Sequence, residues 1–352
     1  MNILCLSLST FDNVGGVQTF NKFFYRALTE NNFNFNVISL HDKKSPNKKV
    51  HVCSSNYFKF LYLLFKYSNS ETIIIWQHVS LTFFLPILLC IKKIKKNILT
   101  LYGTEVWGNN MPILKKICFM KIDYYWCISK FTANQIIKKY CIEKEKIKIF
   151  PCCIDTSIRT NFEKNPYQVN QFNILSILRL DKSGKLNAVY DILRVMPNLI
   201  KIHKNIHYTI IGEGNYKQKV INDINKSNIK NHISILGYVQ DTRPYLEHCD
   251  IFTLTSPLEG FGIVYLEAML YEKPCLASKN CGSQDVVLNG KTGYSFNIKE
   301  FKKLTSKISE IINNKPKRTE LGKKGYEHLM ENFTFSKFKE NQKTLLLNIL
   351  RV

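Results

Sequence analysis

Two glutamates stand on either side of a Gly-Phe-Gly in SPLEGFGIVYLEAML, residues 256–270. The stretch follows a strand-like run at residues 250–255 and leads into residues 263–271, where apolar residues recur at helical spacing. A carboxylate accepts two hydroxyl hydrogen bonds at once, which suits the diols of sugars. Glu259 and Glu267 could therefore hold a sugar and a ribose. Alternatively, Glu259 caps the helix and Glu267 is a surface residue.

The glycines of the same stretch suit a phosphate. Gly260 and Gly262 have no Cβ, so the backbone from Gly260 through Phe261 to Ile263 can approach a ligand closely. A helix that begins near Ile263 would direct its unpaired N–H groups and the positive end of its dipole at the same place. This combination predicts an anion-binding turn.

Two cations follow an earlier strand. The run SILRLDKSGK overlaps the end of a strand-like segment at residues 173–178 and contains Arg179 and Lys185. From the end of a strand, both could reach a diphosphate leaving group and stabilise its growing negative charge. Each residue taken alone is equally typical of an ordinary surface cation.

Three further glycine turns are weaker signals. IIGEGN supplies Gly212 after a strand, and ILGYV could offer its backbone to a base, with Tyr238 packing nearby. Gly15 and Gly16 join the first strand to a helix, as in the opening unit of a doubly wound sheet. A tight turn alone would also explain each of them.

The composition is that of a folded and strongly basic protein. Among 352 residues, 45% are apolar and 12% are aromatic, and the net charge of +23 predicts an anionic partner such as a phosphate-rich ligand or an acidic membrane surface. Nucleic acid is not expected, because no helix-turn-helix, finger or RNP pattern occurs. The eleven cysteines form no C-x-x-C pair, which indicates free thiols in a reducing compartment and no metal site.

Strand-like and helix-like runs alternate in two successive series. The second series starts after residues 156–171, an irregular polar stretch that we interpret as a linker. This order predicts an α/β protein with two facing, Rossmann-like, doubly wound domains and a cleft between them. We expect the first domain over residues 1–165 and the second over residues 166–335. A last helix at residues 336–352 is expected to pack back toward the first domain.

The first half also contains apolar, aromatic and lysine-rich runs. They are YFKFLYLLFKY at residues 57–67, IKKIKKN after the apolar run at 81–90, and ILKKICFMK soon after. Such runs suit an anionic bilayer surface, and the alternative is core helices with solvated cationic faces. No apolar run approaches the roughly 20 residues of a spanning helix, and the start lacks the basic region of a signal peptide. We expect a cytoplasmic protein, peripheral at the inner face of the plasma membrane.

In combination and order, these motifs resemble the family 4 retaining glycosyltransferases, glycosyl transferases of group 1 with the GT-B architecture. The acid pair around Gly-Phe-Gly is the most specific match. The resemblance spans nearly the whole chain through GGVQTF, LYGTEVWG, RLDKSGK, IIGEGN, SPLEGFGIVYLEAML and GSQDVVLNGKTGYSF. It implies two facing Rossmann-like domains that bind a nucleotide sugar.

The resemblance also implies roles for particular residues. Arg179 and Lys185 would contact the donor diphosphate, and Glu259, with the backbone of residues 260–263, would hold the transferred sugar. Glu267 would bind the nucleotide ribose. Gly212 and Tyr238 would belong to the same donor site.

On the first domain, Gly15 and Gly16 would lie against the phosphates or the acceptor, and GTEVW, with Glu105, would face the acceptor. Tyr102, also expected on the acceptor side, stands where the family has a histidine that contacts the sugar, and a phenol can still donate a hydrogen bond. The chain also departs from the family pattern at Leu186, Cys152 and Cys153, where glycine or Asn-Gly is usual.

The implied activity is metal-independent sugar transfer with retained anomeric configuration. The donor would be a nucleotide diphosphate sugar, with a UDP-sugar first among the choices, and no cofactor is expected. The acceptor would be a glycan or polyprenyl-linked molecule in the synthesis of a bacterial cell-surface polysaccharide such as O-antigen, capsule or exopolysaccharide. Two alternatives stay open, a nucleotide-sugar epimerase of the same fold and a non-catalytic nucleotide-sugar-binding partner.

Overall fold

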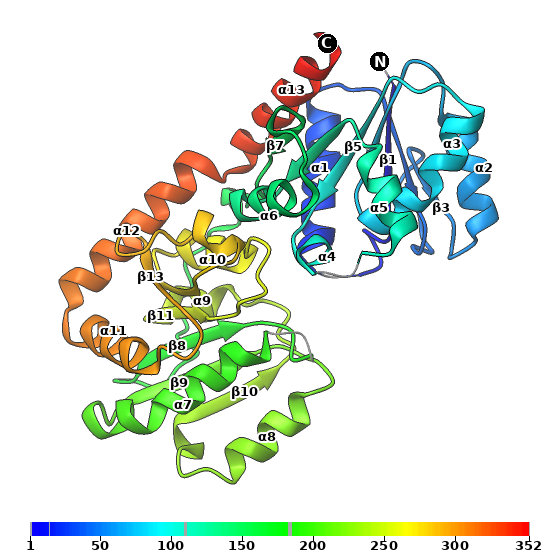
Figure 1. Cartoon of the computed structure of the whole chain (residues 1–352). Coiled ribbons are helices and arrows are strands. Elements are labelled where there is room, and N and C mark those ends of the chain that lie inside the picture. Colours follow the sequence, from blue (N-terminus) through cyan, green and yellow to red (C-terminus); the bar gives the residue numbers. More distant parts are fainter. Residues whose placement is uncertain (1, 14, 109–110, 182–184, 352) are drawn as a thin grey trace. The chain divides into compact units, whose positions relative to one another are not determined.

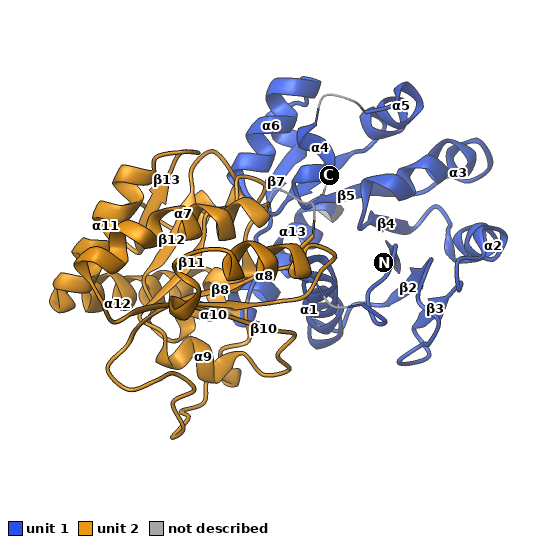
Figure 2. Cartoon of the chain, turned by 90° about the horizontal axis from the view of Figure 1, so that it is seen from below, with its two compact units in different colours: residues 1–153, 335–352 blue, residues 154–334 orange. Residues whose placement is uncertain are grey.

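The computed structural model describes residues 2–13, 15–108, 111–181 and 185–351. The chain forms two compact units, one of residues 1–153 with 335–352 and the other of residues 154–334 (Figure 2). Each unit is a parallel sheet with covering helices, as the alternating sequence pattern predicts.

Unit 1 contains a seven-stranded sheet in the order β3-β2-β1-β4-β5-β6-β7. Its strands are β1 Asn2–Ser7, β2 Phe35–Ser39, β3 Val50–Val52, β4 Thr72–Trp76, β5 Lys96–Leu101, β6 Tyr124–Cys127 and β7 Ile147–Ile149. Its helices are α1 Gly16–Glu30, α2 Tyr57–Tyr67, α3 Leu85–Ile91, α4 Thr104–Trp107, α5 Ile113–Met120, α6 Lys130–Tyr140 and α13 Phe335–Arg351, with 3-10 turns η1 Val79–Phe84 and η2 Lys144–Lys146 (Figure 1).

The strands of unit 1 are apolar because helices cover both faces of the sheet. Every residue of β4 is buried. Leu4 and Leu6 of β1 belong to one core with Phe60 of α2 and Phe119 of α5. Side chains alternate along a strand, so Cys5 lies on the opposite face.

The last helix, α13, packs along α1 within unit 1. The rings of Phe20 and Phe338 meet edge to face, with their centroids 5.4 Å apart. The Gln342 side-chain amide donates to the carbonyl of Phe24 at 2.9 Å. These contacts tie the end of the chain to its first helix.

Unit 2 contains a six-stranded sheet in the order β10-β9-β8-β11-β12-β13. Its strands are β8 Phe172–Ile177, β9 Ile206–Ile211, β10 Ile233–Gly237, β11 Ile251–Leu254, β12 Cys275–Ser278 and β13 Gly293–Phe296. Its helices are α7 Leu186–Ile202, α8 Lys217–Asn225, α9 Arg243–His248, α10 Ile263–Leu270, α11 Phe301–Asn313 and α12 Lys315–Asn332, with 3-10 turns η3 Thr156–Ile158, η4 Lys230–His232 and η5 Gly282–Asp285.

The strand order of unit 2 reverses between β8 and β11. These two strands are neighbours in the sheet, although helices and two other strands separate them in sequence. Loops that leave such a pair run in opposite directions and leave room for a ligand at the carboxyl ends of the strands. The chemically interesting runs of the sequence follow these two strands.

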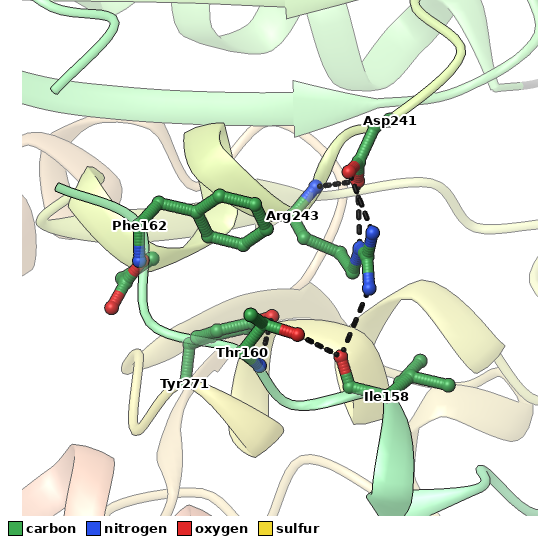
Figure 3. A network of polar contacts seen from close by, with 7 residues as sticks. Ile158, Thr160, Phe162, Asp241, Arg243 and Tyr271 are labelled. Atoms are coloured by element: carbon green, nitrogen blue, oxygen red, sulfur yellow. Dashed lines mark hydrogen bonds and ion pairs between the residues drawn. The ribbon is translucent and has the colours of Figure 1, made fainter. Parts of the chain in front are cut away.

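The interpretation of residues 156–171 as a linker is wrong, because this segment packs on unit 2 (Figure 3). Arg159 forms an ion pair with Glu272, with Nη2 and Oε1 3.1 Å apart. The ring of Phe162 lies against the guanidinium of Arg243. The segment is irregular and polar because its partners are side chains of helices and loops far along the chain.

The unit boundaries therefore differ from the expected ones. They lie between residues 153 and 154 and between residues 334 and 335, where the sequence suggested 165/166 and 335/336. Ile154 and Thr334 pair in a single β-bridge, so the chain enters and leaves unit 2 at the same point.

The loop after β1 is held in shape by the buried carboxylate of Asp42. It accepts hydrogen bonds from the hydroxyls of Ser9 and Ser39 at 2.6 and 2.7 Å, and from the amides of residues 10–12 at 2.8 to 3.1 Å. Burial would raise the pKa of Asp42, but these hydroxyl and amide donors outweigh it and hold the pKa below its ordinary value. Asp42 belongs to none of the sequence motifs described above, although an acid just after a strand is a recognisable signal.

Asp42→Ala should destabilise unit 1 by about 3 kcal/mol or more, because two hydroxyls and three amides lose a buried charged acceptor. Urea unfolding followed by tryptophan fluorescence measures this, since Trp76, Trp107 and Trp126 all lie in unit 1. A lowered carboxyl pKa stabilises the fold above the unfolded pKa of about 4 and loses its effect as the pH falls below it. The difference between the proteins should thus shrink at acid pH.

Asp42→Asn is the matched control for this prediction. Its amide oxygen can still accept some of these hydrogen bonds, so the loss of stability should be smaller than for alanine. An unfolding midpoint of Asp42→Ala that equals that of the unaltered protein would show that the carboxylate does not hold the loop.

Candidate functional site

The carboxyl ends of β8 and β11 bring Lys185 and Glu259 together. Lys185 immediately precedes α7, and Glu259 lies in the loop between β11 and α10. Lys185 Nζ and Glu259 Oε2 are 3.0 Å apart, and the two side chains are 33% and 10% exposed. The Ser176 hydroxyl of β8 donates to the Thr253 carbonyl of β11 at 2.7 Å, which ties together the strands that carry the pair.

The carboxylate of Glu259 has unused capacity to accept hydrogen bonds. Its Oε2 accepts none from the described residues, although the Lys185 ammonium lies beside it as an ion-pair partner. Buried polar atoms in proteins are normally hydrogen-bonded. A ligand with hydroxyl donors could hydrogen-bond to the free Oε2 of Glu259. The Lys185 ammonium would continue to balance the negative charge of the carboxylate.

The turn after Glu259 presents backbone N–H groups. Within the described part of the chain, no protein group accepts from the amides of residues 260–263. Gly262 caps α10 in a left-handed conformation with φ of 93°, and a Cβ there would lie 2.4 Å from the Tyr265 ring. Phe261 anchors the turn, because its buried ring packs edge to face on Phe333. The amides of residues 260–263 are thus without a protein acceptor among the described residues.

This turn rests on a glycine that follows β12. The amide of Gly282 donates to the Glu259 carbonyl at 2.8 Å. A Cβ at position 282 would lie 1.7 Å from the carbonyl oxygen of Gly260. Gly282 is the first residue of the motif GSQDVV, but the sequence alone indicated no role for it. Its place directly after a strand, at the same sheet edge as Glu259, is the signal that could have identified it.

The loops after β9 and β10 pack on the loop after β8. Gly212 has φ of +148°, and a Cβ there would lie 1.8 Å from the Leu178 carbonyl oxygen. Its amide donates to the Gly237 carbonyl at 2.8 Å. Tyr238 is 69% exposed, and its amide donates to Glu213 Oε1 at 3.1 Å. Gly212 therefore positions the loops, while Tyr238 presents its ring to solvent.

Arg179 lies at the surface and does not join the Lys185–Glu259 pair. Its side chain is 76% exposed, and its Nε lies 3.5 Å from Asp181 Oδ2. Residues 182–184 of the same motif lie outside the described residues. The structure thus brings one of the two predicted cations to Glu259.

Glu267 lines a pocket of about 220 Å³ within unit 2, together with Asp241, Arg243, Tyr271 and Ile158. Arg243 forms a bidentate ion pair with Asp241: its Nε donates to Oδ1 at 2.8 Å and its Nη2 donates to Oδ2 at 2.7 Å. Arg243 Nη1 also donates to the Ile158 carbonyl (Figure 3). Burial raises the pKa of Glu267 to about 7. Asp241 and Arg243 belong to none of the sequence motifs described above, although charged residues that follow a strand, here β10, are a recognisable signal.

The predicted residues of unit 1 lie in two different environments. Gly15 caps α1 in an extended conformation, and Gly16 is the first residue of the helix. Tyr102 is buried, and its hydroxyl donates to Asn21 Oδ1 at 2.8 Å. Glu105 accepts from the Tyr102 amide, and burial raises the pKa of Glu105. The Tyr102 hydroxyl is therefore already hydrogen-bonded inside unit 1, and Tyr102 is not part of the proposed site.

Other features of the described residues do not add a second chemical centre. No three His, Cys, Asp or Glu side chains among them gather in a way that could hold a metal ion. No helix in the described ranges is both long enough and apolar enough to cross a membrane. A cavity of about 620 Å³ in unit 1 lies at the amino ends of β5 and β6, opposite the edge where ligands bind in such sheets.

Residues 157–328 match the model of a known protein family, the glycosyl transferases group 1. The chain is also 25% identical, over 252 residues, to an uncharacterized glycosyltransferase of Methanocaldococcus jannaschii. The matched part is 68% of this chain and 66% of that protein, so the chain spans slightly less than two thirds of the relative's length.

Two solved structures share the fold over almost the whole chain. The structure of Anabaena HepE in complex with UDP and glucose has a TM-score of 0.82 and 16% identity, with 99% of this chain and 100% of that chain covered. The lipopolysaccharide outer core galactosyltransferase WaaB has a TM-score of 0.77 and 18% identity, with 99% of each chain covered. These likenesses confirm the GT-B fold class expected from the sequence.

Proposed function

We propose that this chain, whose residues 157–328 match the family model of the glycosyl transferases group 1, is a retaining glycosyltransferase of the family 4 type. It would move a sugar from a UDP-sugar to a glycan or lipid-linked acceptor. The Lys185–Glu259 pair carries the proposal, because a nearly buried carboxylate with unused acceptor capacity stands beside a cation and four unpaired amides. Sugar hydroxyls donate to carboxylates, whereas phosphates accept from ammonium and amide groups.

The donor would lie along the turn between β11 and α10. Its transferred sugar would donate hydroxyl hydrogen bonds to Glu259, and its diphosphate would accept from the amides of residues 260–263, where the dipole of α10 also favours negative charge. The ribose would reach Glu267, one turn further along the helix. The choice of uridine is supported by HepE, whose structure contains UDP.

Transfer would begin when the bond between the sugar and the diphosphate loosens toward an oxocarbenium ion. Lys185, the amides of the turn and the exposed Arg179 would stabilise the negative charge that grows on the departing diphosphate. The acceptor hydroxyl would attack from the same face and pass its proton to a leaving phosphate oxygen. Protein cations and amides supply the positive charge in this scheme, so we propose that it proceeds without a metal ion.

The proposed acceptor belongs to a bacterial cell-surface polysaccharide. WaaB, which shares the fold, is a lipopolysaccharide outer core galactosyltransferase, and this supports the proposed class of product. The proposed place of action is the cytoplasmic face of the plasma membrane. Within the enzyme, Gly15, Gly16 and Glu105 would lie on the side that binds the acceptor.

A panel of thermal-shift measurements tests the donor. UDP and UDP-sugars should raise the melting temperature, because a ligand that binds only the native state stabilises it by mass action. GDP, ADP and their sugars serve as controls. Product analysis of UDP-sugar incubated without acceptor then separates the transferase from an epimerase, which would release an altered sugar nucleotide. The absence of a shift with every nucleotide in the panel would overturn the proposal.

Glu267 makes a separate prediction about pH. The affinity for UDP-glucose should rise between about pH 6 and pH 8, because the carboxylate that accepts the ribose hydroxyls forms only as Glu267 ionises near pH 7. Calorimetric titration checks this, and UDP-glucose is preferable to UDP, whose terminal phosphate itself titrates near pH 6. Glu267→Gln should bind more weakly and without this pH dependence. An unchanged pH profile in that variant would remove Glu267 from the site.

The same raised pKa predicts how stability depends on pH. The native state keeps the Glu267 proton up to about pH 7, whereas the unfolded chain loses it near pH 4.5. The contribution of Glu267 to stability is therefore complete below about pH 4.5 and is lost as the pH rises toward 7.

A further inference from the structure

Three helices of unit 1, α2, α3 and α5, expose apolar side chains, and α2 and α5 also carry lysines. In Figures 1 and 2, α2, α3 and α5 lie side by side. The ring of Phe84, at the end of η1, contacts the rings of Tyr57 and Phe60 of α2, and η1 also packs on α5. Eleven of the twenty-one exposed large apolar side chains of the described residues fall within residues 57–120. The lysine-rich apolar face consists of Phe58, Tyr62, Ile91, Ile113, Leu114 and Ile117, with Lys59, Lys66, Lys115 and Lys116.

The apolar part of this face is unusual for a helix surface. On α5, the side chains of Ile113, Leu114 and Ile117 are 69%, 63% and 48% exposed. On α2, Phe58 and Tyr62 lie one turn apart and are 88% and 63% exposed. An ordinary surface helix turns its apolar stripe to the core and its polar side to water, so these side chains favour a partner outside the unit.

The charge on the face has a single sign. The sequences of α2 and α5 contain lysines, that of α3 is uncharged, and none of the three contains Asp or Glu. Among the described residues, no acidic side chain forms an ion pair with Lys59, Lys66, Lys115 or Lys116. A partner of this face should therefore combine negative charge with an apolar layer.

We infer that the lysine-rich apolar face docks on the surface of an anionic lipid bilayer. The lysines would lie among the phosphate headgroups, and the apolar side chains would enter the interface beneath them. A second copy of the chain fits less well, because the lysines of the two copies would face each other. Nucleic acid would meet the cations but would leave Phe58 and Ile113 without apolar contacts.

This inference deepens the proposed function and rests on it for its purpose, since a lipid-linked acceptor would then meet an enzyme already at the surface. Docking itself is independent of catalysis. The test therefore uses vesicles without any sugar, so that a failure of docking and a failure of glycosyl transfer are distinguishable.

Vesicle flotation of the full chain is the direct experiment. The protein should float with vesicles of phosphatidylcholine containing about one third phosphatidylglycerol and should stay behind with phosphatidylcholine alone. Salt should weaken the binding, because it screens the lysines. Equal binding to both kinds of vesicle, or to neither, would overturn the inference.

Two double variants locate the surface. Lys59→Glu with Lys116→Glu, both exposed, should weaken binding by about twentyfold or more, since each surface lysine contributes about fivefold. Ile113→Ser with Ile117→Ser should weaken it by about tenfold or more, because two apolar side chains no longer enter the interface. Both pairs are exposed or partly exposed, so the melting temperature and the UDP thermal shift should stay unchanged and confirm the fold.

Matched substitutions in unit 2 serve as controls. Lys302→Glu with Lys323→Glu makes the same charge change, and Val169→Ser with Ile298→Ser removes exposed apolar side chains elsewhere. Neither pair should alter flotation by more than about twofold, apart from the small effect of net charge. If the controls act as strongly as the face variants, or if the unaltered protein is a dimer that Ile113→Ser with Ile117→Ser dissociates, the face serves a different partner.

Discussion

Lys185→Met is expected to reduce kcat/KM for the nucleotide sugar by two to three powers of ten. The substitution keeps an unbranched side chain, one atom shorter, but removes the positive charge that would stabilise the departing diphosphate, and loss of one such group typically costs about that much. Nucleotide release from the donor selected by thermal shift measures the effect. Lys307→Met is the matched control, because Lys307 also forms an ion pair with a glutamate of unit 2, on α11 and outside the proposed site.

The partner substitution Glu259→Gln should lower kcat/KM about a hundredfold, because an amide accepts with one oxygen where the carboxylate accepts with two. The double variant separates catalysis from folding. Each single change leaves a partly buried group without its partner, so the Lys185→Met Glu259→Gln protein should regain stability but not activity. If both single variants keep a kcat/KM within twofold of that of the unaltered protein, the Lys185–Glu259 pair is not the active site.

Gly282→Ala should abolish most of the activity while changing a residue that touches no substrate in the proposed scheme. A Cβ at position 282 would lie 1.7 Å from the Gly260 carbonyl oxygen, so the turn that carries Glu259 must move. A displacement of about 1 Å at a catalytic group costs on the order of a hundredfold in rate. Steady-state kinetics with the same donor provide the measurement.

Two observations keep this prediction distinct from general unfolding. Circular dichroism should retain the helical signal of the unaltered protein, and the loss should appear mainly in kcat/KM. Gly108→Ala is the control, since a Cβ there meets no atom of the described residues within 4 Å. If Gly282→Ala keeps normal kinetics, the contact between residue 282 and the turn does not position Glu259.

Several features of the fold could be predicted from the sequence because they depend on local pattern. The expected strands at residues 173–178 and 250–255 correspond to β8 Phe172–Ile177 and β11 Ile251–Leu254, and the helix expected from residue 263 is α10. Buried parallel strands are short apolar runs, and turns and helices between them have their own periodicity. Because parallel strands end at one edge, the residues that follow them could be grouped into one site before their partners were known.

Other features depend on contacts between residues far apart in the chain. The predicted linker is part of unit 2 because Arg159 forms an ion pair with Glu272 and the ring of Phe162 contacts the guanidinium of Arg243. No local sequence pattern predicts these two contacts. The Tyr102 phenol was expected near the acceptor, but its hydroxyl is paired with Asn21 in the interior. Burial and pairing of this kind follow from packing, which the order of residues does not show directly.

The sequence by itself thus determined two parallel α/β sheets and the acids, cations and glycines at their carboxyl edges, because periodicity and strand direction are local properties. The tertiary structure alone decided that Lys185 meets Glu259, that Gly282 supports their turn and that Asp42 holds the first loop. Each of these depends on a distance of a few ångströms between elements that pack together only in the folded chain.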